Sequence, residues 1–324
     1  MAPTTTADRA TIALDLYGPV GRSAWLDIDW RTYQRWVRVG GRWMNVIDIG
    51  PSADAGAAAG TIVWIHGLSG SWQNWLENLP LFARTHRCIA MDLPGFGESE
   101  MPAEKITISG YAAAVDELLR VLGVTRATVV GNSMGGFVGA EVAIRFGTWV
   151  DKLVLVSAAG LTTEHLRNDH ALALLRRGSR LLALGAGWLA SRSDELARRP
   201  RSRRAILSIV AAHPDRLPAP LVAEQLHGAG GLGFIDALDA LTSYPIRDRL
   251  GEITAPTLVV WGAKDALVPA RDAWEFGKLI PGARVVVYED TGHLSMLERP
   301  VAFNALTQEF LANTGPGGRV HPRV

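Results

Sequence analysis

The chain has 324 residues, 48% of them hydrophobic, which is enough for a large buried core in one or two domains. Its 33 lysines and arginines nearly balance its 32 aspartates and glutamates, and the formal net charge of +1 excludes bulk electrostatic attraction to nucleic acid. The single cysteine, Cys88, excludes an internal disulfide, and its apolar surroundings predict a buried strand position.

Residues 1–32 are predicted to form an N-terminal extension. The first nine residues lack the basic leader and continuous apolar stretch of a signal peptide, so we expect a cytoplasmic protein. Composition predicts disorder over about the first ten residues and a flexible tail at 315–324. Between Tyr33 and Ile49, apolar and polar residues alternate around Gly40-Gly41, which predicts a β-hairpin, and residues 54–60 predict a flexible loop.

From Thr61 onward, short apolar runs alternate with helical stretches. The predicted strands are Thr61–Ile65, Arg87–Met91, 128–130, 153–156, 257–261 and 284–287. Together with the hairpin they give an α/β fold with a mostly parallel, eight-stranded sheet flanked by helices, built from residues 33–160 and 247–314. Residues 111–122 predict an amphipathic scaffold helix, and the helix after Ser133 is expected to end at Gly147.

Residues 161–246 break this rhythm. They lack strand signals and are helical by pattern, which predicts a helical lid inserted after the sixth strand. Apolar residues and arginines crowd this segment: Leu172, Leu175, Leu182, Trp188, Leu189, Arg176, Arg177, Arg180, Arg198, Arg199, Arg201, Arg203 and Arg204. A solvated basic face on a packed lid is the favoured interpretation, and the alternative is peripheral contact with a membrane or lipid. A membrane span is excluded, because no uncharged apolar run approaches the ~20 residues required.

The motif Gly131-Asn132-Ser133-Met134-Gly135 lies between a β-branched run and a helical stretch. A serine at a sharp strand-to-helix turn projects its hydroxyl above the sheet, and the flanking glycines permit close packing there. Ser133 is therefore predicted to be a catalytic nucleophile.

A serine nucleophile needs a histidine base and a carboxylate that orients the base. Asp265 follows one predicted strand, and His293 follows the next. The order Ser, Asp, His is that of an α/β-hydrolase triad. Asp290 is the rival acid, but it is too close in sequence to His293 to approach the ring easily from behind.

A tetrahedral intermediate also needs preorganised hydrogen-bond donors for its oxyanion. The backbone N–H of Met134 is one predicted donor. The second is assigned to Leu68, in the glycine-containing loop after the strand Thr61–Ile65, with Ser69 as the neighbouring alternative. His66 is interpreted as a histidine that braces this loop rather than a base.

These motifs in combination resemble the α/β-hydrolase superfamily. They are His66-Gly67, Asp92-Leu93-Pro94-Gly95-Phe96-Gly97-Glu98-Ser99, Gly131-Asn132-Ser133-Met134-Gly135-Gly136, Gly262-Ala263-Lys264-Asp265 and Gly292-His293-Leu294-Ser295-Met296-Leu297-Glu298-Arg299-Pro300. Within the superfamily, Ser157-Ala158-Ala159-Gly160-Leu161 and a methionine three residues past His293 are most similar to monoacylglycerol-lipase-type carboxylesterases. The serine motif also resembles hydrolases that cleave carbon–carbon bonds of ring-fission products. Those usually carry a tryptophan where this chain has Leu294.

The resemblance implies a serine hydrolase that cleaves a small or medium carboxylic ester through an acyl-enzyme. Two alternatives remain open: a carbon–carbon bond hydrolase, and a ligand-binding member of the fold without turnover. Trp72, Trp188 and Leu294 are candidates for the substrate pocket, although a tryptophan more often serves packing. His165 and His170 are further candidates at the lid mouth. The sequence has no zinc-type Cys/His spacing and no phosphate-binding glycine loop, so no metal or cofactor is expected. The oligomeric state is not predicted.

Overall fold

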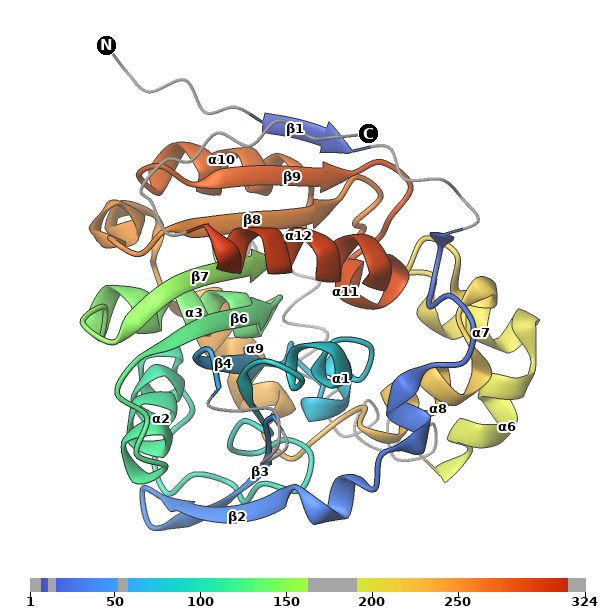
Figure 1. Ribbon diagram of the computed structural model, residues 1–324, viewed down its shortest axis with the longest axis horizontal. Helices are drawn as coiled ribbons and strands as arrows, with labels where there is room; N and C mark the ends of the chain where they lie inside the picture. Colours follow the sequence, from blue (N-terminus) through green and yellow to red (C-terminus); the bar gives the residue numbers. More distant parts are fainter. Residues whose placement is uncertain (1–6, 11–15, 52–57, 163–190, 314–324) are drawn as a thin grey trace.

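The computed structural model describes residues 7–10, 16–51, 58–162 and 191–313. Within these ranges nine strands form one sheet in the order β1-β9-β8-β7-β6-β4-β5-β3-β2 (Figure 1). The strands are β1 (Ala7–Ala10), β2 (Gln34–Val39), β3 (Arg42–Ile49), β4 (Thr61–Ile65), β5 (Arg87–Met91), β6 (Ala127–Asn132), β7 (Val150–Val156), β8 (Thr257–Gly262) and β9 (Arg284–Tyr288). Among these strands, only β3 runs in the opposite direction: it pairs antiparallel with β2 and with β5, and the other neighbouring strands pair in parallel, which confirms the mostly parallel sheet.

Eight of the nine strands are those that the sequence predicts. The ninth, β1, pairs in parallel with β9 from Ala7 opposite Val285 to Ala10 opposite Tyr288. The prediction of disorder over the first ten residues was therefore wrong for β1. A four-residue segment is too short to show a period of two, and the open edge of β9 offers unpaired backbone groups to it.

The sheet is covered on both faces. Behind it in Figure 1 lie α2 (Ile108–Val121), α3 (Met134–Arg145) and α10 (Arg271–Leu279), and in front lie α1 (Leu79–Phe82), α11 (Ser295–Glu298) and α12 (Pro300–Ala312). Alternate residues of one strand enter the two cores: Val63 and Ile65 pack toward α2 and α3, whereas Ile62 and Trp64 pack toward α1 and α12. Buried parallel strands are apolar on both faces for this reason.

The helix boundaries agree with the predictions to within a few residues. The first turn of α2 begins before the predicted start, where the Thr107 hydroxyl accepts a hydrogen bond from the Gly110 amide at 2.9 Å. Helix α3 ends at Arg145, two residues before Gly147. Cys88 lies on β5 and is fully buried, as predicted.

The described part of the predicted lid is helical. It contains α6 (Ser193–Arg198), α7 (Pro200–Leu207), the 3₁₀ turn η7 (Pro214–Arg216), α8 (Ala219–His227) and α9 (Phe234–Ser243). Outside residues 161–246, the described part of the chain also contains the 3₁₀ turns η2 (Ala24–Asp27), η3 (Trp30–Thr32), η5 (Trp72–Trp75) and η8 (Arg247–Glu252). The arrowheads of β6, β7 and β9 point toward the side of the molecule that carries α6, α7 and α8 (Figure 1). In an open parallel sheet, ligands bind at these carboxyl ends of the strands.

Candidate active site

Ser133 occupies a strained turn between β6 and α3. Its backbone has φ 55° and ψ −118°, a conformation that a residue with a β-carbon rarely adopts. The Ser133 amide donates to Val156 O at 2.9 Å, and its carbonyl accepts from Ala159 N at 3.0 Å. Four backbone elements therefore hold the serine in place: β6, α3, the end of β7 and the chain that follows it.

Glycines make this turn sterically feasible. A β-carbon on Gly135 would lie 2.2 Å from the carbonyl oxygen of Ile65 in β4, and one on Gly131 would lie 2.2 Å from the carbonyl oxygen of Gly135. Because both obstacles are backbone atoms of packed elements, neither can move aside cheaply. The strand, turn and helix agree with the geometry predicted around Ser133.

His293 and Asp265 form a buried hydrogen-bonded pair. His293 Nδ1 lies 2.7 Å from Asp265 Oδ2, while Asp265 Oδ1 accepts from the amides of Leu267 and Val268 at 2.9 Å each. An ionised carboxylate only accepts hydrogen bonds, so this contact assigns a proton to Nδ1, and in the neutral imidazole Nε2 then keeps its lone pair. This is the tautomer that a general base requires.

The rival acid, Asp290, faces other partners. It pairs with Lys264 Nζ, with His213 Nε2 at 2.8 Å and with Arg299 at 3.8 Å. Burial alone would raise the pKa of Asp290, but the hydrogen bonds from Lys264 and His213 lower it. Asp290 therefore belongs to an ion-pair cluster, whereas Asp265 contacts His293.

The loop after β4 lies directly against the serine. A β-carbon on Gly67 would be 3.1 Å from Ser133 Cβ, and the Gly70 amide closes a turn onto Gly67 O at 3.0 Å. Leu68, in this turn, is half-buried, and Met134 is the buried first residue of α3. The neighbouring Ser69 has φ 62°, and its hydroxyl accepts from Gly230 N of the lid at 2.6 Å.

His66 braces this loop. Its Nε2 accepts from the Leu93 amide at 2.9 Å, so its Nδ1 carries a proton and donates to Gly67 O at 2.7 Å. Complete burial lowers the pKa of His66, despite the opposing influence of Asp92, and favours this neutral form. The interpretation of His66 as a bracing histidine agrees with these contacts.

Two supporting residues carried no assigned role in the sequence analysis. The buried Asn132 side chain donates to Val156 O at 3.1 Å and to His293 O at 3.3 Å, which links the serine turn to the histidine. The buried carboxylate of Asp92 accepts from Trp72 N at 2.8 Å and from Asn45 Nδ2 at 2.9 Å. Both residues stand inside quoted motifs, but the motifs do not reveal which distant groups they contact.

The predicted pocket residues differ in their placement. Trp72 is buried, and its ring centroid lies 5.0 Å from that of Trp30 in the core that contains α1 and α12. Leu294 is half-buried and packs against the same core. Trp188, His165 and His170 lie outside the described residues, as do the predicted lid residues from Leu172 to Leu189.

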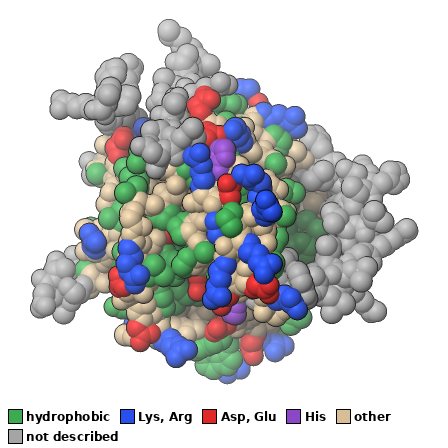
Figure 2. Space-filling model, turned by 90° about the vertical axis from the view of Figure 1, so that its right-hand side faces the viewer, with side chains coloured by type: hydrophobic (Ala, Val, Ile, Leu, Met, Phe, Trp, Pro, Cys, Tyr) green, Lys and Arg blue, Asp and Glu red, His purple; other side chains and the backbone are tan. Residues whose placement is uncertain are grey.

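The described lid arginines are mostly exposed. Arg198, Arg199, Arg201 and Arg204 are exposed, whereas Arg203 is buried and donates to the carbonyls of Ala197 and Asp215 at 2.6 and 2.8 Å. The expectation of a surface charge was therefore wrong for Arg203, whose guanidinium instead joins α7 to α6 before it and to η7 after it. Figure 2 shows the lid side, where Lys and Arg side chains gather among hydrophobic ones. Among the residues that the structure covers, no helix is both long and apolar enough to cross a membrane.

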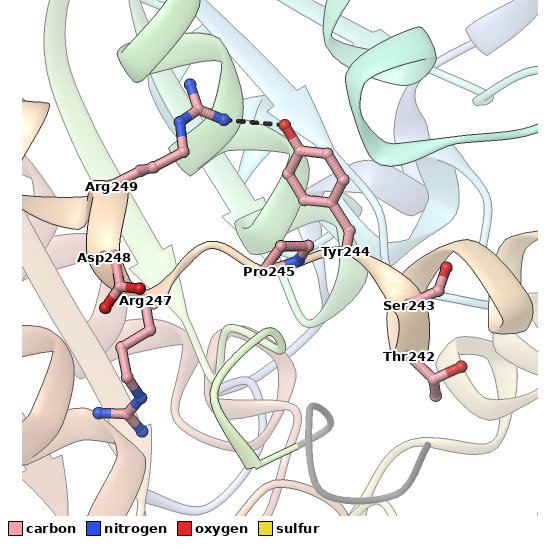
Figure 3. A pocket seen from close by; sticks show the side chains of 7 residues that line it. All are labelled: Thr242, Ser243, Tyr244, Pro245, Arg247, Asp248 and Arg249. Atoms are coloured by element: carbon pink, nitrogen blue, oxygen red, sulfur yellow. Dashed lines mark hydrogen bonds between the residues drawn. The ribbon is translucent and has the colours of Figure 1, made fainter. Parts of the chain in front are cut away.

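Two cavities lie away from the candidate triad. One, of about 360 Å³, is lined by residues 242–245 and 247–249, between α9 and η8 (Figure 3). There Arg249 donates to the Tyr244 hydroxyl at 2.8 Å, and both bond to the buried Glu141 of α3. This network joins the end of the helical insertion to α3, the helix that follows Ser133. The second cavity, of about 220 Å³, lies between the β2-β3 hairpin and α2.

In the described ranges, no group of three or more His, Cys, Asp or Glu residues is placed to hold a metal ion.

The family model for the alpha/beta hydrolase fold matches residues 60–300. The chain belongs to the α/β-hydrolase family. It is 30% identical over 263 residues to an uncharacterized protein of Mycobacterium tuberculosis, covering 79% of this chain and 76% of that protein. It is also 30% identical over 284 residues to a 2-hydroxy-6-oxononadienedioate/2-hydroxy-6-oxononatrienedioate hydrolase of Cupriavidus pinatubonensis, covering 80% of this chain and 89% of the relative.

Solved structures of α/β hydrolases share the fold. The crystal structure of a membrane phospholipase A, a bacterial virulence factor, superposes with a TM-score of 0.65 and 27% identity. The superposition covers 86% of this chain and 85% of the phospholipase. The proteins that this α/β hydrolase resembles thus include one named as a phospholipase A and one named as a 2-hydroxy-6-oxononadienedioate hydrolase.

Proposed function

We propose that this α/β hydrolase is a serine esterase with Ser133 as nucleophile, His293 as general base and Asp265 as the acid that orients the base. The observation that carries the proposal is the buried hydrogen bond of 2.7 Å between His293 Nδ1 and Asp265 Oδ2. It fixes the tautomer in which Nε2 can accept a proton. The strained Ser133 turn at the carboxyl end of β6 supplies the hydroxyl.

The reaction proceeds in two steps. His293 Nε2 takes the proton of Ser133 as the hydroxyl oxygen attacks the ester carbonyl, and the protonated histidine then gives that proton to the departing alcohol. A water molecule next loses a proton to His293 and attacks the acyl-enzyme, and the protonated histidine returns that proton to the Ser133 oxygen as the carboxylic acid departs. The amides of Leu68 and Met134 are the proposed donors to the oxyanion in both steps.

The proposed substrate is a neutral ester with a small or medium acyl chain. Leu68 and Leu294 are apolar and half-buried, so they favour an uncharged group beside the site. Burying a substrate carboxylate without a matched cation costs several kcal/mol. The likeness to a membrane phospholipase A supports an ester as the scissile group.

A carbon–carbon bond hydrolase is the second candidate. It is favoured by the 30% identity to the 2-hydroxy-6-oxononadienedioate hydrolase over 89% of that relative's length. Its dicarboxylate substrate would need a cation beside the triad, and Arg176, Arg177 and Arg180 of the lid are the residues we would test first.

Labelling and kinetics decide between these proposals. A fluorophosphonate probe should label Ser133, located by peptide mass spectrometry, and should leave Ser133→Ala unlabelled. On a p-nitrophenyl ester series and a dienoate ring-fission product, we expect higher kcat/KM for the esters. At least tenfold more efficient dienoate cleavage would overturn the esterase proposal. Absence of both labelling and turnover would favour a ligand-binding protein.

A further inference from the structure

A buried carboxylate lies behind the candidate catalytic histidine. Glu298, in α11, is fully buried and accepts four hydrogen bonds. Its Oε2 accepts from Tyr17 Oη at 2.5 Å, from Ala212 N at 2.8 Å and from Gly292 N at 2.9 Å. Its Oε1 accepts from Leu294 N at 3.1 Å. Three segments far apart in the sequence therefore meet at one side chain.

Two of these donors flank His293. With the amides of Gly292 and Leu294 both bonded to Glu298, the backbone on each side of the histidine is fixed to the same carboxylate. The His293 amide donates to Val210 O of the lid at 3.0 Å, and the His293 carbonyl accepts from Asn132. Glu298 and its four donors form a clamp, and the direction of the imidazole then depends on this clamp as well as on Asp265.

Tyr17 brings the N-terminal extension into the clamp. Its hydroxyl donates to Glu298 and accepts from His213 N at 2.9 Å, while Gly18 N donates to Glu298 O at 2.7 Å. The Arg299 guanidinium lies 4.9 Å from the centre of the Tyr17 ring, which stabilises the buried ring further. Residues 16–33, blue in Figure 1, descend beside α7 and α8. Tyr17 precedes residues 60–300, to which the family model applies.

The protonation states suit these roles. Burial, followed by the charge of Glu298, raises the pKa of Tyr17, so its hydroxyl remains a donor across the working pH range. Burial also raises the pKa of Glu298, while the hydrogen bonds from Tyr17 and the three amides oppose the rise. Because all four partners donate hydrogen bonds to its two oxygens, the Glu298 carboxylate acts only as an acceptor.

We propose that Glu298 is a positioning residue for His293 and that Tyr17 of the N-terminal extension completes it. The extension and residues 210–213 of the lid thereby determine how the base is presented to Ser133. This inference rests on the proposed function of His293. No hydrogen bond in the described structure joins Tyr17 or Glu298 to Ser133, so their effect should reach the reaction through the histidine, in kcat rather than in KM.

Paired hydroxyl deletions test the inference. Tyr17→Phe removes only the oxygen that bridges Glu298 and His213 N. Tyr111→Phe is the matched control, because Tyr111 is also buried, packs in a different hydrophobic core and donates to Pro94 O at 3.2 Å rather than to Glu298. Glu298→Gln is the stronger variant, since an amide cannot accept all four hydrogen bonds and turns its NH₂ toward N–H donors. Ester kinetics are measured beside hydrogen–deuterium exchange of peptides that cover residues 288–298 and 208–217.

Tyr17→Phe should lower kcat on the order of tenfold, and Glu298→Gln on the order of 10²-fold, with KM within about twofold of the parent. Exchange should rise in both peptides for these variants and stay at the parent level in Tyr111→Phe. Unchanged exchange over residues 288–298 would overturn the clamp. Faster exchange with unchanged kcat would overturn the positioning role.

The exchange measurement also separates this inference from the proposed function. If the parent hydrolyses no ester and takes no fluorophosphonate, the esterase proposal fails. In that case the clamp is judged by exchange and by the ¹⁵N-histidine NMR signal of the His293 Nδ1–H, identified by its loss in His293→Asn. A signal that is unaltered in Tyr17→Phe and Glu298→Gln would overturn it, whereas a broadened or shifted signal would support it.

Discussion

The serine turn and the histidine loop are two halves of one candidate site, and they are held by different means. Ser133 lies in a strained backbone conformation that glycines at residues 131 and 135 make sterically possible, and backbone hydrogen bonds to Val156 and Ala159 hold it. His293 contacts Asp265, Asn132 and Val210, and its two neighbouring amides donate to Glu298. The serine half thus depends mainly on backbone sterics, whereas the histidine half depends mainly on side chains from distant parts of the chain. The two halves should therefore respond differently to mutation.

The largest effect should come from the serine itself. Ser133→Ala removes the oxygen that we propose attacks the ester, but leaves the turn and its glycines in place. Ester hydrolysis should fall by on the order of 10⁴-fold or more, with a thermal unfolding midpoint close to that of the parent. Activity within tenfold of the parent would show that another residue forms the covalent bond.

The next effect concerns the acid. Asp265→Asn places an amide at Nδ1 of His293 and disturbs the tautomer, so kcat should fall by about 10²- to 10⁴-fold. The matched control is Asp290→Asn, which acts on the ion-pair cluster with Lys264 and His213, and kcat should stay within about threefold. A larger loss in Asp290→Asn than in Asp265→Asn would reverse the assignment of the acid.

On the serine side, the close backbone packing at the glycines should dominate the free energy of unfolding. Gly135→Ala places a β-carbon against Ile65 O at 2.2 Å, and we expect a loss of about 3 kcal/mol or more in the free energy of unfolding, or failure to fold. Gly251→Ala is the control, because the nearest atom to its added β-carbon, Leu279 O, lies at 3.9 Å. Urea denaturation measures the free energy of unfolding of both variants. Equal stability of the two variants would show that the turn tolerates a shift of β4.

The smallest expected effect is a dependence on pH. Burial lowers the pKa of His66 below that of the unfolded chain, so the unfolded state binds the additional proton. The stability that neutral His66 contributes is complete above the unfolded pKa of about 6.5 and is lost as pH falls below it. The difference in unfolding free energy between parent and His66→Gln should therefore shrink from pH 7.5 to pH 5.5. A difference that grows on acidification would mean that His66 is protonated in the folded state.

The same contrast explains what the sequence could reveal. The strands, Ser133, Asp265 and His293 follow from local patterns, because apolar runs and turn glycines are properties of a few consecutive residues. The strand β1, the clamp at Glu298 and the burial of Arg203 could not be predicted, since each depends on a partner far along the chain. Arg203 is one of several arginines in this stretch of sequence. Only its hydrogen bonds to the carbonyls of Ala197 and Asp215 set it apart from the exposed ones.

The pairing of β1 with β9 bears on how the protein is made. Ala7 lies opposite Val285, and Tyr17 bonds to Glu298, 281 positions further along the chain, so these residues leave the ribosome long before their partners. The pairing along β9 and the hydrogen bond at Glu298 can form only after residues 284–298 have been synthesised. Long-range contacts of this kind slow folding, because the partners must be brought together across a long stretch of chain. A nascent chain in which β4, β5 and β6 have already folded would thus still lack the assembled loop of the proposed catalytic base.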